Sequence, residues 1–485
     1  MVDLIRLNRA HDLRGRSLFF LTFLSAIATF ISEDKLLFLL GDAVLILFVY
    51  LYYNRTFPPV LLVSALFQWF FFYGKLLDGL FKGRSVLMIN NFSKTYPDII
   101  ILGFLGTAFF FVGVYFTARK VPIISFNDFK LFCNRIHLGR LIKVYILIYV
   151  TLFTIGDFIW FFPGLSQPLY ILTLFRWSMF FLLFITVFYQ NKFKGLLLLL
   201  VLIDIMVGFF SFFSHFKEAI YFAFLAYWIF FFRSAIGTRI FTFAIIIVTI
   251  YLGIYWTAIK QDYRLFLNKG TGAQAVLTTR GESYSRLLEL AGNAQDKALE
   301  QSSGELLNRL SWIGVFDRVY KRVPEKIPFE EGALWWNGIT RPFMPRLFFP
   351  EKKGLADSKE LNYYSALDVD EKHTSISLSM MAGSYVDFGE WGMHAPLFLF
   401  GLFCGWVYSK AIKWGRYVVI GYALTMPMTY LMQINEQSIN RMVSAMFLYF
   451  LVMWFLQKFV LEYFLHFILS EKRERAEIKS ITQIN

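Results

Sequence analysis

Apolar runs of about 17–23 residues recur along this chain, and they constrain its fold more than any other feature. A helix of that length crosses a hydrocarbon core roughly 30 Å thick, because it rises about 1.5 Å per residue. Hydrophobic residues make up 57% of the chain and aromatic residues 20%. In lipid the backbone must satisfy its own hydrogen bonds, and uninterrupted runs of this length do so as helices. The sequence therefore predicts an all-α polytopic membrane protein.

We expect about twelve transmembrane helices, with one large extracytoplasmic loop, partly helical, between helices 9 and 10. The regions are 1–258 with helices 1–9, 259–393 with the large loop, 394–467 with helices 10–12, and 468–485 as a cytoplasmic tail. The predicted spans are 17–32, 36–53, 59–75, 98–117, 141–163, 168–190, 195–214, 217–233, 239–258, 395–413, 416–434 and 443–466.

The positions of the basic residues predict the orientation of these helices. Of the 48 Lys and Arg residues, 23 fall at the two termini and in the connectors on the same side of the membrane. Cytoplasmic connectors carry such an excess, so we expect both termini in the cytoplasm. Topology therefore accounts for the net charge of +14, and no nucleic-acid partner is expected. The external connector 75–97 is an exception, since its four basic residues suit an external anionic ligand.

The loop 259–393 differs in character from the rest of the chain. It contains 17 Lys or Arg residues and 18 Asp or Glu residues, so its net charge is close to zero. Prolines and glycines between 335 and 350 exclude a long helix there, and a helix is expected from about Thr374 to the region of Gly389. A charge-balanced segment of this size outside the membrane is where we expect the candidate active site.

Neither a metal nor a cofactor is expected. The six histidines form no HExxH pattern of the kind that holds a metal ion. The two cysteines, Cys133 and Cys404, are both predicted in the cytoplasmic half, where disulfides are rare.

Four short segments resemble three motifs of bacterial O-antigen and exopolysaccharide repeat-unit polymerases. The segment 345–352, PRLFFPEK, resembles a proline–arginine–aromatic motif of that family. The segments 373–376 (HTSI) and 385–392 (YVDFGEWG) resemble a second motif, and 214–218 (SHFKE) resembles a serine followed by a basic residue. Two departures are the position of Lys217 and the spacing after Arg280, which is one residue longer than in some members.

The resemblance implies a membrane glycosyltransferase of surface polysaccharide biosynthesis in the bacterial cytoplasmic (inner) membrane. Such a polymerase transfers a growing glycan from its undecaprenyl-diphosphate carrier onto a lipid-linked repeat unit. Its partners would be undecaprenyl-diphosphate-linked oligosaccharides, membrane lipid and a chain-length regulator protein. Arginines suit a diphosphate leaving group, because the guanidinium stays ionised and binds phosphate oxygens through two hydrogen bonds.

These requirements select the candidate site residues. Arg346 would stabilise the diphosphate, and His373 is the first candidate for the base that deprotonates the acceptor hydroxyl, followed by Asp387 and Glu390. The proposed diphosphate and sugar contacts come from cations and aromatic side chains: Lys217, Arg280, Arg341, Arg441, Tyr385, Trp335 and Trp336.

Each candidate also has a structural interpretation. Arginines and tryptophans are common at membrane interfaces as anchors, and Lys217 falls at the boundary of a predicted span. Charges inside spans are costly and usually paired, so we expect an ion pair between Asp157 and Arg176. Asp204, in the seventh span, has no predicted partner.

Three classes of function are compatible with the sequence. The first is the polymerase, and the second is a related lipid-linked glycan transferase, such as an O-antigen ligase. An enzyme that uses a monophosphate-linked sugar is less favoured, because the first external turn, at Glu33 and Asp34, is too short to form a site. The third is a non-enzymatic flippase. Flippases usually have short external loops and charges within the bundle, often in repeated halves.

Overall fold

Every regular element in the described part of the chain is a helix, which confirms an all-α membrane protein. A single isolated bridge joins Ile136 to Leu469. The structure is a computed structural model. It describes residues 23, 27, 29–53, 58–89, 94–122, 124, 126–158, 165–209, 216–231, 234, 236–271, 276–292, 313–344, 349, 357–369 and 376–469.

Seven helical stretches within the described residues are long and apolar enough to cross a membrane. All seven overlap predicted spans, and the count of twelve stays a prediction. They are Lys35–Tyr52 (α2), Val60–Phe81 (α3), Tyr96–Ala118 (α5), Ser166–Gln190, Ile236–Leu267 (α12), His394–Trp414 (α19) and Ile439–Ile468. The fourth comprises α8 (Ser166–Leu174) and α9 (Arg176–Gln190), and the last comprises α21 (Ile439–Phe455), the π-helix η4 (Leu456–Val460) and α22 (Leu461–Ile468).

Further apolar helices lie between these stretches, and shorter helices connect them or cover one end. The apolar ones are α7 (Leu138–Phe158), α10 (Lys194–Phe209), α11 (Phe216–Phe231) and α20 (Val418–Leu424). The others are α4 (Val86–Ile89), α6 (Phe126–Arg135), α13 (Arg280–Gly292), α15 (Ile313–Tyr320), α16 (Ala333–Thr340), η2 (Arg341–Phe343), α17 (Asp357–Ser365), α18 (Met380–Gly392) and η3 (Met426–Thr429).

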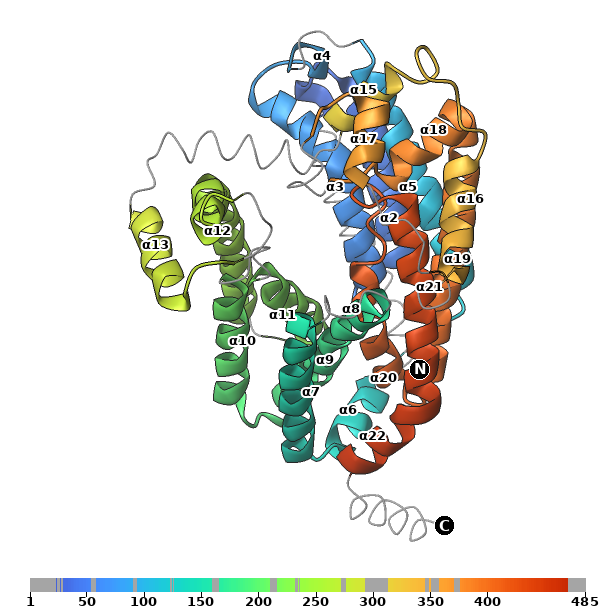
Figure 1. The fold of residues 1–485 in the computed structure, drawn as a ribbon. Helices are drawn as coiled ribbons and strands as arrows, with labels where there is room; N and C mark the ends of the chain where they lie inside the picture. The colour runs from blue at the N-terminus through green and yellow to red at the C-terminus, as the bar shows by residue number, and fades with distance from the viewer. Residues whose placement is uncertain are drawn as a thin grey trace.

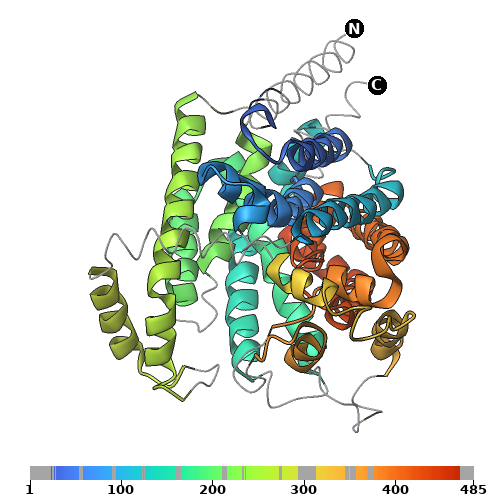
Figure 2. The same ribbon diagram turned by 90° about the horizontal axis from the view of Figure 1, so that it is seen from above.

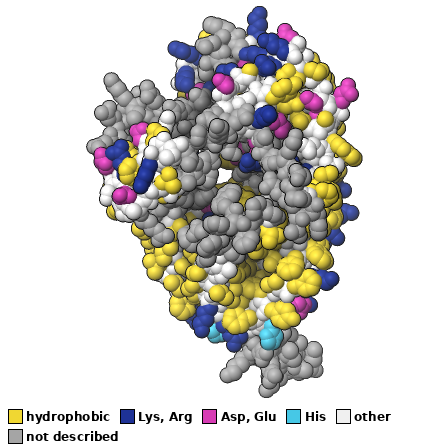
Figure 3. Space-filling model, in the orientation of Figure 1, with side chains coloured by type: hydrophobic (Ala, Val, Ile, Leu, Met, Phe, Trp, Pro, Cys, Tyr) yellow, Lys and Arg dark blue, Asp and Glu magenta, His cyan; other side chains and the backbone are white. Residues whose placement is uncertain are grey.

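The two ends of the bundle differ. Helices α4, α15, α17 and α18 gather at one end, and α6 and α22 lie at the other (Figure 1). Charged side chains are visible at both ends, and hydrophobic side chains cover much of the surface between them (Figure 3). This distribution is the one expected of a helical bundle in a bilayer.

Glycines allow α5 and α19 to pack with their backbones in close contact. A Cβ atom on Gly113 would lie 2.3 Å from the carbonyl oxygen of Phe398, and one on Gly401 would lie 2.1 Å from that of Phe110. The Thr117 hydroxyl adds a hydrogen bond of 2.8 Å to the carbonyl of Leu402 on the facing helix. Small residues bring membrane helices together in this way. Lipid tails are as apolar as the side chains, so helix association in the bilayer depends on dispersion contacts and interhelical hydrogen bonds rather than on the hydrophobic effect.

The span predicted at 416–434 is shorter in the structure. Helix α20 ends at Leu424 and η3 ends at Thr429, and 430–438 is irregular backbone inside the protein. Asn435 holds this segment against the middle of α3, since its N–H donates to Gln68 Oε1 at 2.9 Å and its side-chain amide donates to the Gln68 carbonyl. Irregular backbone at membrane depth is tolerated where protein covers it or where it lines a cavity.

Helix α12 extends beyond the predicted span, because it runs to Leu267 and so includes the first residues of the loop predicted from 259. A separate apolar cluster, containing Trp256, Ile259 and Tyr263, joins its last turns to the start of α11 at Phe216. Helix α13 packs against α12, and the two lie at one edge of the bundle when it is seen from above (Figure 2).

Candidate functional site

A polar cavity of about 400 Å³ lies between α8, the irregular segment 430–438 and the start of α21. We call it the Arg441 cavity. Its position follows from the early end of η3, which leaves polar side chains of the following segment beside α8 rather than in a helix. Its polar lining consists of Ser166, Gln167, Tyr170, Tyr430, Gln433, Gln437, Arg441 and Ser444.

Arg441 is held at this cavity by contacts with Ser438 and Asp357. It stands in the first turn of α21, where the N-cap hydroxyl of Ser438 accepts its backbone N–H at 3.4 Å. The same hydroxyl donates to Asp357 Oδ1 at 3.1 Å, and the other Asp357 oxygen is ion-paired with the Arg441 guanidinium. Asp357 is buried, so this pair joins α17 to the first turn of α21.

A second polar cavity, of about 180 Å³, adjoins the first one, with which it shares Tyr170 and Tyr430. We call it the Arg176 cavity. Arg176 Nη2 lies 3.0 Å from Glu218 Oε2, and its Nη1 lies 3.8 Å from Asp204 Oδ1. The Tyr149 hydroxyl donates to the same Asp204 oxygen at 3.0 Å.

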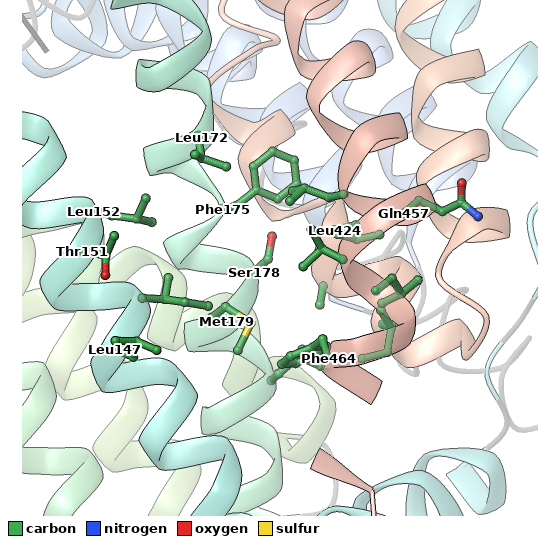
Figure 4. A pocket seen from close by; sticks show the side chains of 17 residues that line it. Leu147, Thr151, Leu152, Leu172, Phe175, Ser178, Met179, Leu424, Gln457 and Phe464 are labelled. Carbon is green, nitrogen blue, oxygen red and sulfur yellow. The ribbon is translucent and has the colours of Figure 1, made fainter. Parts of the chain in front are cut away.

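An apolar cavity of about 360 Å³ lies deeper along the same helices (Figure 4). Figure 4 shows Leu147, Thr151 and Leu152 on one side of it, with Leu424 and Phe464 opposite. The lining is almost entirely hydrophobic, and it includes 172–182 from α8 and α9 and 456–464 from the end of the last span.

The three cavities are adjacent to one another. The Arg441 cavity and the apolar cavity are lined by successive parts of the same two segments, 166–182 and 441–464. The Arg176 cavity shares Leu152 with the apolar cavity and Tyr170 with the Arg441 cavity. Together they offer an elongated amphipathic ligand an apolar region and two polar ones.

Asp387 and Trp335 come together above these cavities, and their contacts are structural. Asp387 Oδ1 accepts the N–H of Leu334 at 3.1 Å and Oδ2 accepts that of Trp335 at 2.8 Å, so the carboxylate caps the amino end of α16. The indole N–H of Trp335 donates to Ser384 Oγ at 3.0 Å, and both residues are buried. Burial raises the pKa of Asp387, while these N–H groups oppose the rise.

Glu360, on α17, is a carboxyl group whose pKa lies near neutrality. Burial raises its pKa to about 7, and the nearby carboxylates of Asp357 and Asp387 add to the rise, while Arg341 opposes it. Arg341 therefore lies close to Glu360, at the junction of α16 and η2. A half-buried carboxyl with this pKa can hold or release a proton near neutral pH.

The other predicted site residues lie apart from the cavities. Tyr385 is buried among Phe316, Tyr320 and Phe329, and its hydroxyl donates to the Val323 carbonyl at 2.8 Å. These are the contacts of a residue in a packed core.

Trp336 is 70% exposed, and Lys217 is exposed with its ammonium 5.7 Å from the centre of the Phe216 ring. The backbone of Arg280 begins α13, and its side chain lies outside the described part, as does that of Asp157. Arg346 and His373 also lie outside the described residues, so their roles stay predictions, as does the Asp157–Arg176 ion pair.

Sequence reasoning missed several residues of the cavities. Glu218 follows Lys217 directly, and it is Glu218 that lines the Arg176 cavity. The resemblance directed attention to the basic residue only. The polar run from Gln433 to Ser438 interrupts an apolar region, which was an available signal for a break in the helix. Nothing local distinguishes Asp357 or Glu360 from other loop carboxylates.

A family model described as a domain of unknown function, DUF8712, matches residues 102–467. The match spans most of the chain, from within α5 to within α22. The chain belongs to this family. Because all residues that line the three cavities fall within the match, the DUF8712 region contains the complete candidate site. No curated protein and no solved structure matches the chain.

Proposed function

We propose that this protein is a polymerase of lipid-linked oligosaccharides. It transfers a growing glycan from its undecaprenyl-diphosphate carrier to a carrier-linked repeat unit during surface polysaccharide synthesis. The observation that carries the proposal is the apolar cavity aligned with the polar Arg441 cavity along the same two segments. A ligand with an apolar chain and a polar head group matches this arrangement. The motif resemblance indicates that this ligand is an undecaprenyl-diphosphate-linked glycan.

In the proposed step, an acceptor hydroxyl oxygen attacks the anomeric carbon of the donor glycan. The bond between that carbon and the diphosphate oxygen breaks, and undecaprenyl diphosphate leaves with both bonding electrons. The hydroxyl proton passes to a general base. Arg441 binds the departing diphosphate, whose negative charge increases during the step. Arg346 is a second candidate cation, and His373 stays the first candidate base, because both Asp387 oxygens cap α16.

The proposal includes the topology expected from the sequence. The chain would cross the bacterial inner membrane twelve times, with both termini in the cytoplasm and the loop 259–393 outside. The donor and acceptor would then meet at the external end of the bundle. A chain-length regulator protein is a further proposed partner.

A flippase for lipid-linked oligosaccharides is the second candidate, and one observation favours it. Arg176 and Glu218 are ionisable groups that line a cavity within the bundle, and Asp204 lies beside Arg176. Such groups frequently mark transport routes. The large predicted external region, with its ion pair between Arg441 and Asp357, is more typical of an enzyme active site. We therefore rank the polymerase first.

A reconstitution experiment separates these functions. Purified full-length protein in liposomes, given only lipid-diphosphate-linked repeats, should extend them and release undecaprenyl diphosphate. It should need neither a nucleotide sugar nor an added divalent metal. A flippase would instead move single units between leaflets without changing their length. A ligase would transfer glycan only when a separate acceptor is supplied. Absence of any chain extension would refute the polymerase proposal.

A further inference from the structure

Helix α16 and the turn η2 that follows it lie alongside the upper part of α21 (Figure 1). Gly338 in α16 lies very close to the start of α21, since a Cβ atom on it would be 2.7 Å from the Ile439 side chain. The centre of the Phe343 ring in η2 lies 5.0 Å from that of the Phe447 ring. Phe447 follows Ile439 by eight residues, so the second contact lies about 12 Å further along α21. The segment 333–343 therefore follows α21 from its first residue into the bundle.

Both ends of this segment lie at the same end of the bundle. Helix α16 begins at Ala333, five residues before Gly338, so its start lies about 7.5 Å before the first residue of α21. After η2 the chain returns to this level by Asp357, the first residue of α17. Asp357 is ion-paired with Arg441 and accepts a hydrogen bond from Ser438, the N-cap of α21. The chain between Ala333 and Asp357 thus goes down α21 and comes back.

The face of α16 and η2 that points away from the protein is apolar. Trp336 is 70% exposed, Ile339 is 46% exposed and Phe343 is 64% exposed, whereas Trp335 and Gly338 on the other side of α16 are buried. Helix α16 contains no charged residue. In water such a surface would be unfavourable, because large apolar side chains would remain hydrated.

The polar groups of the segment are placed as a lipid environment requires. The Thr340 hydroxyl donates to the carbonyl of Trp336 at 2.9 Å, so it is satisfied within the helix. The exposed amide of Asn337 is next to Gly338 and therefore lies at the level where α21 begins. Arg341 lies close to Glu360 of α17, so its charge is balanced within the protein.

Helix α21 continues the apolar surface beyond Phe343. It carries Leu451, Trp454 and Phe455, which are 40%, 41% and 52% exposed. These residues follow Phe447 by four, seven and eight positions, so they share one face of the helix with it. Because α21 belongs to a stretch that is long and apolar enough to cross a membrane, its exposed apolar face is expected to contact lipid. Phe343 lies at the upper end of this face.

We propose that residues 333–344 form a re-entrant segment, which enters the bilayer beside α21, leaves it on the same side, and contacts lipid acyl chains through Trp336, Ile339 and Phe343. The continuity of its exposed face with that of α21 indicates lipid as the neighbour. The irregular backbone after α16 is tolerated at this depth because η2 packs against α21. The proposal divides the loop 259–393, which the sequence predicts to lie outside the membrane, and it does not depend on glycan transfer.

The test measures membrane depth along the segment with nitroxide spin labels. In full-length protein carrying Cys133→Ala and Cys404→Ala, single cysteines are introduced at three exposed positions: Ala333, Trp336 and Phe343. Each labelled protein is reconstituted in lipid nanodiscs, and power-saturation EPR measures collisions with molecular oxygen, which concentrates among acyl chains, and with a water-soluble nickel chelate. Size-exclusion profiles establish that each protein is folded.

Two further positions serve as references for lipid and for water. Leu399 is 61% exposed within the candidate span α19, and Glu325 is exposed in the turn after α15. We expect the ratio of oxygen to nickel collisions to rise from Ala333→Cys through Trp336→Cys to Phe343→Cys. At Phe343→Cys it should equal the value at Leu399→Cys and exceed that at Glu325→Cys several-fold, because the bilayer core excludes water.

Three results would overturn the proposal. A ratio at Phe343→Cys equal to that at Glu325→Cys would place the segment in water. Low collision rates with both reagents would show that another protein or a second copy of this chain covers it. Equal ratios at the three positions would exclude a segment that descends into the bilayer. None of these outcomes affects the proposed function, which the extension of lipid-linked repeats tests separately.

Discussion

The carboxylate of Asp387 caps the amino end of α16, where its Oδ2 atom accepts the backbone N–H of Trp335 at 2.8 Å. This relationship distinguishes a structural from a catalytic role, because asparagine keeps one of the two acceptor oxygens but cannot accept a proton as a base. We predict that Asp387→Ala lowers the free energy of unfolding by about 1 kcal/mol. Asp387→Asn should lose less stability than Asp387→Ala and remain active in glycan transfer.

Thermal unfolding in detergent and the liposome extension assay measure the two effects. Asp128→Asn, on α6 at the opposite end of the bundle, is a control for the loss of a carboxylate. A stable Asp387→Asn protein that has lost transfer would instead identify Asp387 as the base.

Replacement of Arg441 by lysine should preserve the stability of the protein but reduce its activity. Arg441→Ala would leave the buried Asp357 without its partner, and breaking a buried ion pair costs about 3–5 kcal/mol, so loss of activity in that variant would be ambiguous. Arg441→Lys keeps the positive charge and loses the planar fork that binds phosphate oxygens. We expect the extension rate to fall on the order of tenfold with little change in melting temperature. Arg416→Lys, at the pair with Glu462, is the matched control and should retain full activity.

Hydropathy predicts the long helices well and the interrupted one poorly. The bounds of α2, α5 and α19 agree with the predicted spans to within two residues, because these helices are apolar along their whole length. The segment 416–434 also has the composition of a span. It stops being helical near Thr429 because the residues that follow bond to α3 and to Ser377. A hydropathy window along the sequence does not detect such tertiary contacts.

The candidate site was less predictable than the fold. Arg441 was selected from the sequence, but its partner Asp357 lies 84 residues earlier in the chain. Arg176 was expected to be paired within the membrane, and the structure places it beside Glu218, 42 residues away, and Asp204. Such pairs depend on how the helices pack, and no residue spacing encodes them. Tyr385 and Trp335 were selected as aromatic residues of an external loop, where the sequence alone does not reveal burial.

Stability should decrease as the pH rises toward neutrality because of Glu360. Its pKa lies at about 7 in the folded protein, against an ordinary value of 4.5. Between these values the folded state binds more protons than the unfolded state, so the free energy of unfolding falls as the pH rises through this window. Glu436 has a pKa raised to about 7 by burial and contributes in the same direction.

Glu360→Gln should therefore reduce the slope of melting temperature against pH between 4.5 and 7, and the double variant with Glu436→Gln should reduce it further. Glu325→Gln, at an exposed turn after α15, is the control that should leave the slope unchanged. An identical slope in the wild type and the Glu360→Gln variant would contradict the raised pKa.

The orientation in the membrane can be tested with cysteines at two exposed positions. Glu325 lies in the loop predicted to be external, and Lys192 lies in the turn between α9 and α10, which is predicted to be cytoplasmic. In a background with Cys133 and Cys404 replaced, an impermeant thiol reagent on intact cells should label Glu325→Cys and not Lys192→Cys. Both should react after the membrane is permeabilised. The reverse pattern on intact cells would show that the predicted orientation is wrong.

We predict that the apolar cavity binds the lipid chain of the carrier-linked donor. Leu147 lines this cavity and is 66% exposed, so Leu147→Trp adds bulk at its edge without overpacking the core. We predict that the KM for the lipid-linked donor rises on the order of tenfold, equivalent to about 1.4 kcal/mol of lost binding. Leu198→Trp is the matched control, since Leu198 is 60% exposed on α10 and does not line the cavity. If the Leu147→Trp protein is folded and inserted in the membrane but its KM is unchanged, the lipid chain does not bind in this cavity.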